Sequence, residues 1–182
     1  MGIIESVGSP EFAKIIDSDG TVRKQQVEPL TNYFVLRIQK DFNKGNSTFG
    51  TVLTSTYRNL NVEELQFMNK TATVGGVDFR QYLLNRKFSF SGKYMVSHYT
   101  GTSQAMLYQQ TAPQRYFQRP NADYVSVDSN LTSLTGSYAY FDVARNKMQG
   151  LRNSLSVMYF SPSFEINDLG YLRNANNLME IF

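Results

Sequence analysis

The segment FSFSGKYMVSHY, residues 88–99, decides the fold, because its side chains alternate between two chemical types. One set is large and apolar apart from a glycine: Phe88, Phe90, Gly92, Tyr94 and Val96. The other set is small or polar apart from one methionine: Ser89, Ser91, Lys93, Met95 and Ser97. Successive side chains of a β-strand point to opposite faces of its sheet. The segment therefore predicts a strand with one apolar and one polar face.

The same period of two recurs along most of the chain. Further apolar faces are predicted from Phe49, Leu53 and Tyr57, from Val77, Phe79 and Leu83, and from Leu151, Leu155, Val157 and Tyr159. Residues 32–42 and 133–145 complete a set of about six clear strands, and residues 2–16 and 104–109 are weaker candidates. Residues 61–70 and 174–182 break the alternation and are predicted as short helices.

Tight turns connect these segments. The stretches DSDG (residues 17–20) and NKGN (residues 43–46) supply residues that tolerate the positive φ angles of hairpin turns, and residues 85–87 form a third reversal. Consecutive strands joined by short turns predict an all-β antiparallel meander. With 182 residues, the chain is predicted to hold one domain, residues 1–182, and no second domain.

Composition excludes several classes of protein. Charged residues make up 18% of the chain, below the roughly 25% of ordinary soluble domains. The net charge of +3 is spread along the chain, so no nucleic-acid partner is expected. The absence of Cys and the single His98 exclude thiolate and two-histidine metal sites, and no cofactor is expected. No run approaches the ~20 apolar residues of a membrane-spanning helix.

The polar faces favour a membrane barrel over a soluble sandwich. Alternation alone fits both, because a sandwich hides its apolar face and an outer-membrane barrel shows it to lipid. The second face of a soluble domain is usually rich in charge, whereas here it is mainly Ser, Thr, Gly and Ala with occasional residues such as Asp78, Arg80 or Lys93. Such a face suits a barrel lumen. We therefore predict part of a transmembrane β-barrel in contact with outer-membrane lipid.

Three stretches resemble a known family. They are VEPLTNYFVLRIQKDFNKGNSTFG (residues 27–50), RYFQRPNADYVSVDSNLTSLTG (residues 115–136) and SPSFEINDLGYLRNANN (residues 161–177). They are similar to the C-terminal barrel region of the DUF5916 family, bacterial proteins that place a carbohydrate-binding family 9-like domain before an outer-membrane β-barrel. The resemblance runs from about residue 2 to the end of the chain.

This resemblance implies that the chain is a fragment of a larger outer-membrane barrel protein. Family members carry a signal peptide, the sugar-binding-like domain and more strands, and the smallest membrane barrels need about eight strands. The family itself has no established function. A link to surface glycan binding or transport is expected, but a role inferred from the sugar-binding-like domain does not transfer to these residues.

The segment YFQRPNADYVSVDSN, residues 116–130, is the candidate binding site. Aromatic rings and charged groups gather there, and the candidate ligand-binding residues are Tyr116, Phe117, Arg119, Asp123, Tyr124 and Asp128. The rings either stack on sugars or pack against neighbouring strands, and packing is favoured. The carboxylates of Asp123 and Asp128 are expected to pair with Arg115, Arg119 or Arg173.

No catalytic residue is predicted, and whether the protein is an enzyme stays open. His98 lies at a strand end without a nearby triad pattern, so it is expected to be a rim or loop residue. A glycosidase would need two carboxyl groups ~5 to 9.5 Å apart, drawn from Asp123, Asp128, Asp142, Glu165 and Asp168. Two alternatives to a membrane barrel fragment remain: a soluble β-rich carbohydrate-binding module, and a barrel enzyme acting on glycan or lipid.

Overall fold

The computed structural model describes residues 1–146, 149–168 and 178–181. Its long strands are β4 (Thr31–Phe42), β5 (Ser47–Arg58), β6 (Thr71–Leu83), β7 (Phe88–Thr100) and β8 (Ser133–Arg145). Shorter strands are β1 (Gly2–Gly8), β2 (Glu11–Ile16), β3 (Val22–Glu28), β9 (Asn153–Phe160) and β10 (Leu178–Ile181). One α-helix, α1 (Ser103–Thr111), and two 3-10 turns, η1 (Asn43–Gly45) and η2 (Glu63–Leu65), complete the described elements.

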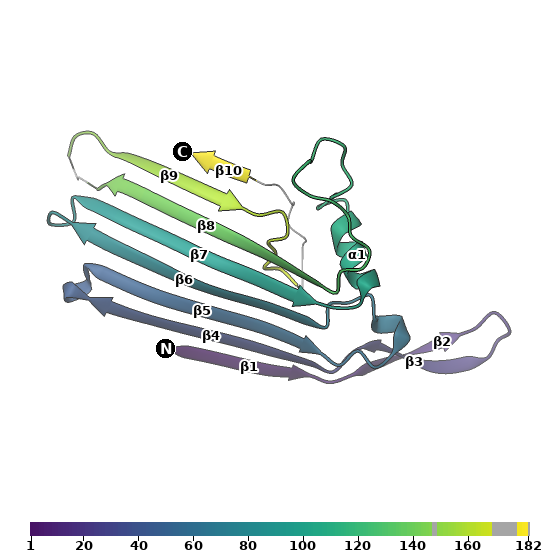
Figure 1. The fold of residues 1–182 in the computed structure, drawn as a ribbon. Helices are drawn as coiled ribbons and strands as arrows, with labels where there is room; N and C mark the ends of the chain where they lie inside the picture. Colours follow the sequence, from purple (N-terminus) through teal and green to yellow (C-terminus); the bar gives the residue numbers. More distant parts are fainter. Residues whose placement is uncertain (147–148, 169–177, 182) are drawn as a thin grey trace.

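Eight of the strands form one antiparallel sheet in the order β1-β4-β5-β6-β7-β8-β9-β10 (Figure 1). The strands β2 and β3 form a separate hairpin that projects from one end of this sheet. The predicted all-β antiparallel meander is therefore confirmed. Within the described residues β1 and β10 are the two edges of the sheet, which does not close into a barrel.

The pairing between the long strands is continuous. Strand β6 pairs with β7 from Thr71↔Thr100 to Leu83↔Phe88, and β7 pairs with β8 over its whole length without a bulge. Because side chains that pair across strands share a face, the alternation of residues 88–99 is carried across the sheet. One face gathers the apolar side chains, and we call it the outer face. The opposite face is the inner face.

The outer face leaves its large apolar side chains partly exposed. On the adjacent strands β5 to β9, the following side chains have exposed fractions between 36% and 55%: Phe49, Leu53, Val77, Phe79, Tyr94, Phe141 and Leu155. Among the described residues no second layer covers this face. No helix in the described part of the chain combines the length and the apolar character needed to cross a lipid bilayer.

The buried core lies instead on the inner face, beneath α1. Tyr99 of β7 and Leu134 of β8 pack there against Ala105 and Met106 of the helix. Close by, the rings of Tyr138, Phe160 and Phe164 lie within 4.7 to 6.1 Å of one another. Helix α1 and its following loop thus sit at one end of the sheet (Figure 1).

The predicted reversals are confirmed at residues 17–20, 43–46 and 85–87. Gly20 and Gly45 have φ angles of +84° and +78°, a region that favours glycine. Asn85 and Arg86 also have positive φ angles. In the first turn, the backbone N–H of Thr21 donates to the Asp19 carboxylate at 2.9 Å and so lowers the pKa of that group.

Several local predictions were wrong. Residues 104–109 are not a strand but belong to α1, because Thr102 caps the helix by accepting the Ala105 N–H at 3.1 Å. Of the predicted terminal helix, residues 178–181 form β10, whose backbone pairs with β9; residues 174–177 and 182 lie outside the described residues. The helix predicted over residues 61–70 shortens to the single turn η2. The weak strand candidate over residues 2–16 is confirmed as extended, but as two strands separated at Pro10, which lacks an N–H donor.

Candidate functional site

Most of the charged side chains of the sheet lie on the inner face. In its middle, the Arg37 guanidinium forms an ion pair with both carboxylate oxygens of Asp78, with Nη2 donating to Oδ1 at 2.9 Å. Gly50 lies between these strands, and a Cβ at this position would overlap Arg37 and Asp78. The glycine therefore lets an arginine of β4 reach an aspartate of β6 across β5.

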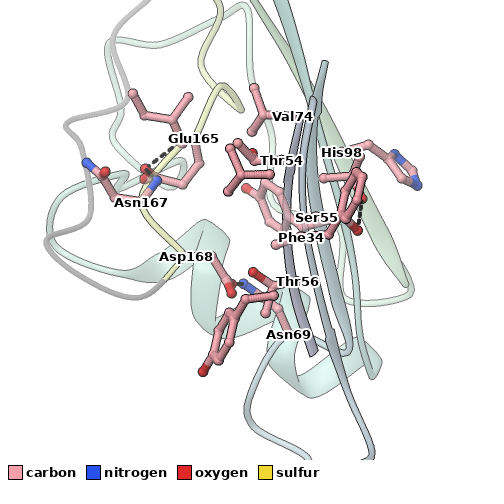
Figure 2. A pocket seen from close by; sticks show the side chains of 16 residues that line it. Phe34, Thr54, Ser55, Thr56, Asn69, Val74, His98, Glu165, Asn167 and Asp168 are labelled. Atoms are coloured by element: carbon pink, nitrogen blue, oxygen red, sulfur yellow. Dashed lines mark hydrogen bonds between the residues drawn. The ribbon is translucent and has the colours of Figure 1, made fainter. Parts of the chain in front are cut away.

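A hollow of about 520 Å³ lies between this face and the segment 165–168 (Figure 2). We call it the first hollow. Its walls come from β4, β5, β6 and β7, and residues 165–168 form its cover. Asp168 accepts a hydrogen bond from Asn69 Nδ2 at 2.9 Å. Its other oxygen lies 2.6 Å from Arg58 Nη2, an ion pair without hydrogen-bond alignment.

A second ion pair, between Arg115 and Glu165, fixes the same cover. Arg115 is only 1% exposed; it donates to Glu165 Oε2 at 3.0 Å and to the Pro162 carbonyl at 3.2 Å. Its guanidinium lies 5.5 Å from the centre of the Tyr99 ring. The Glu165 N–H donates to Ser97 Oγ at 3.1 Å, which ties the cover to β7.

Glycine again permits the close approach of this cover to the sheet. A Cβ at Gly136 of β8 would overlap the backbone of Ser163 and Phe164. The segment 161–168 therefore lies directly on the inner face, held by backbone contact at one point and by two buried ion pairs. We call it the latch.

The candidate residues of the loop after α1 are only partly brought together. Arg119 Nη2 donates to the Tyr124 hydroxyl at 2.6 Å, and its guanidinium lies 5.7 Å from the centre of that ring. The rings of Tyr116 and Tyr124 are about half exposed, whereas Phe117 is buried. Asp123 is exposed. The loop thus presents tyrosines and an arginine to solvent, while Phe117 anchors it.

The predicted pairing of carboxylates in this loop was wrong for Arg115, whose partner is Glu165. Asp128 Oδ1 accepts the N–H of Asn130 at 2.9 Å, and its own backbone is clamped by the Gln110 side chain at 2.8 and 2.9 Å. Arg173 lies outside the described residues. The Asp128 carboxylate therefore accepts a hydrogen bond within its own turn, and the buried Arg115 forms its ion pair with the latch.

His98 is separated from the carboxylates of the first hollow by the sheet itself. Its ring lies on the outer face, where Nδ1 is 2.8 Å from Thr135 Oγ1. Figure 2 shows His98 on the side of the strands opposite Glu165 and Asn167. The described residues contain no group of three or more side chains arranged to hold a metal ion. Glu165 and Asp168 do share the first hollow, but an arginine binds each of them.

Together these features define an antiparallel β-sheet protein with one exposed apolar face and one charged, partly covered face. The family model described as "Domain of unknown function (DUF5916)" matches residues 1–181, and the chain belongs to this family. No curated protein and no solved structure matches the chain.

The latch generates a prediction about stability. Replacing Arg115 by Met removes the arginine from the buried Glu165 carboxylate, whose Oε1 keeps the N–H donors of Ile166 and Asn167. Breaking this buried ion pair should lower the free energy of unfolding by about 3 to 5 kcal/mol. The matched control is Arg23→Met, which breaks the exposed pair with Asp17 and should cost less than about 1 kcal/mol. Urea unfolding followed by circular dichroism measures both variants. Equal losses in the free energy of unfolding would contradict a larger contribution from the buried pair.

Proposed function

We propose that the chain forms part of the wall of a bacterial outer-membrane β-barrel, with the outer face in contact with lipid and the inner face lining the lumen. The observation that supports this most strongly is the continuous outer face, whose large apolar side chains stay partly exposed from β4 to β9. Lipid gives such side chains an apolar environment that water does not.

The strand lengths suit this role. Strands β5, β6 and β7 have 12, 13 and 13 residues. A tilted strand needs about 9 to 11 residues to cross the hydrocarbon core. The long strands therefore have enough length to cross a bilayer and still extend beyond its hydrocarbon core.

The distribution of charge on the outer face also supports it. Among the described strand residues whose register places them there, the charged ones are Glu5, Lys40 and Arg145. Lys40 and Arg145 lie close to the turns that end β4 and β8, and Glu5 lies on the edge strand β1. A basic residue at the bilayer midplane costs ~2 to 4 kcal/mol and near the interfaces only ~0 to 1 kcal/mol. Among the described strand residues, the middle of the outer face carries no basic side chain and so avoids the midplane cost.

The connections suggest an orientation. Residues 43–46 and 84–87 make short turns at one end of the sheet, whereas residues 59–70 and 101–132 make long connections at the other (Figure 1). Outer-membrane barrels have short periplasmic turns and longer external loops. The end that carries α1 is accordingly the external one.

The two alternatives fit less well. A soluble β-rich module needs a layer over its apolar face, and the described residues supply none. An enzyme acting on glycan or lipid needs carboxylates available for proton transfer, yet Glu165 and Asp168 are each bound by an arginine.

The lipid-facing role predicts opposite effects for neighbouring residues of β5. Leu53→Lys places a charge in the apolar band and should reduce liposome association by at least about tenfold, since ~2 kcal/mol or more is lost. Thr54→Lys, on the inner face beside the first hollow, is the control and should associate like the unmodified chain. Flotation of the refolded proteins with liposomes measures this, and equal flotation of the two variants would contradict a lipid-facing outer face.

A second candidate function concerns the external loop. We propose that the exposed rings of Tyr116 and Tyr124, with Arg119 beside the latter, stack on sugars of a surface glycan. Tyrosines combine a flat apolar face with a polar tip, which suits the ring and hydroxyl groups of a sugar.

Glycan binding predicts a loss on removing both rings. The double variant Tyr116→Ala/Tyr124→Ala should weaken binding to immobilised outer-membrane polysaccharide by about tenfold, since each stacking contact contributes ~0.5 to 1.5 kcal/mol. Tyr108→Ala is the control, because Tyr108 is more exposed than either ring but belongs to α1. Surface plasmon resonance measures both, and unchanged binding of the double variant would leave the loop with a purely structural role.

A further inference from the structure

A second hollow lies on the inner face over β6, β7 and β8, toward the end with the short turns. Its volume is about 780 Å³, within the ~300 to 1,000 Å³ of small-molecule sites. Its lining is mainly polar and aromatic, and the charged residues in it are Asp78, Arg80, Arg86, Lys93 and Asp142.

The carboxylates of this hollow already have partners. Asp78 is bound by Arg37, which reaches it across Gly50. Asp142 accepts a hydrogen bond from Ser156 Oγ at 2.8 Å. The charge of Asp78 is therefore matched by an arginine, while Asp142 keeps its negative charge.

Two of the cations form no ion pair with a described residue, although both stand near enough to Asp78 to help Arg37 lower the pKa of that carboxyl. Among the described residues, neither Arg80 nor Lys93 has a carboxylate within ion-pair distance. Arg86, by contrast, donates to Asn46 Oδ1 at 3.0 Å and lies over the Tyr82 ring. The hollow thus has a surplus of positive charge centred on Arg80 and Lys93.

The register brings these two cations close together. Arg80 lies opposite Ser91 and Lys93 lies opposite Asp78, so the two are diagonal neighbours on one face of the β6–β7 pair. Diagonal neighbours of this kind are about 7 to 8 Å apart, a span that two long side chains can close around one anion. The Lys93 ammonium also lies 5.8 Å from the centre of the Tyr140 ring.

We propose that this hollow binds small solutes that carry a carboxylate or phosphate group, and that Arg80 and Lys93 hold the oxyanion. A guanidinium offers a planar fork of donors to an oxyanion, and an ammonium adds a compact charge. The rings of Tyr82 and Tyr140 provide flat surfaces for the rest of the solute. The proposal rests on the proposed function for its place in a lumen, where basic side chains favour anions.

Calorimetric titration of the full chain in detergent micelles tests this, with inorganic phosphate, galacturonate and the neutral sugar galactose as probes. R80Q/K93Q should bind the anionic probes at least about tenfold more weakly than the unmodified chain. The matched control is K14Q/K24Q, which removes two exposed lysines that face each other across the β2–β3 hairpin. This control loses the same charge and should bind normally.

A variant with the opposite effect guards against simple misfolding. D142N removes a negative charge from the hollow while keeping the shape of the side chain, so it should bind both anions several-fold more tightly. Binding of phosphate alone or of galacturonate alone supports the proposal and shows which oxyanion is accepted. Galactose binding as tight as galacturonate, no binding by the unmodified chain, or equal binding by R80Q/K93Q and K14Q/K24Q would overturn it.

Flotation of the same proteins with liposomes separates this site from the membrane role. R80Q/K93Q should float like the unmodified chain, because both residues lie on the inner face. A chain that binds phosphate through Arg80 and Lys93 but stays off liposomes would contradict the barrel wall and leave the anion site standing. A chain that floats but binds no anion would overturn the anion site and leave the barrel wall standing.

Discussion

The unbroken antiparallel register from β4 to β8 is the constraint on which the rest of the structure depends. Side chains alternate with a period of two, so a slip of one residue in any pair would move every following side chain to the other face. The ladder of β6 and β7 carries this order over its whole length. The exposed apolar band and the charged inner face are two results of the same pairing.

The inner face shows how the sheet accommodates charge. Arg37 reaches Asp78 across Gly50, and the latch is held where Arg58 meets Asp168 and Arg115 meets Glu165. Burying a charge is costly unless it is paired. The pairs therefore let a polar face carry a covering segment. Among the described residues Arg80 and Lys93 form no ion pair, and we propose that they hold an anionic solute.

Much of the sheet was predictable, because the alternation in residues 88–99 and the turn residues at 43–46 report directly on strand geometry. The error at residues 104–109 has a tertiary cause: Ala105 and Met106 are buried against Tyr99, which favours the helix there. The site was less predictable. Arg115 and Glu165 are far apart in the chain, and only the fold reveals that they meet. The sequence carries no signal of this contact, because both residues lie in loops outside the alternating strands.

The most direct measurement of the lipid-facing outer face uses the absence of native cysteine. Single cysteines placed in turn along residues 89–96 can carry a nitroxide label in the liposome-bound protein. Labels at Phe90, Tyr94 and Val96 should relax mainly with oxygen dissolved in lipid, and labels at Ser89, Ser91 and Met95 mainly with a water-soluble nickel chelate. The ratio of relaxation by oxygen to relaxation by the nickel chelate is predicted to alternate with a period of two along the strand. Shielding of Phe90, Tyr94 and Val96 from both reagents, as in a packed protein core, would contradict it.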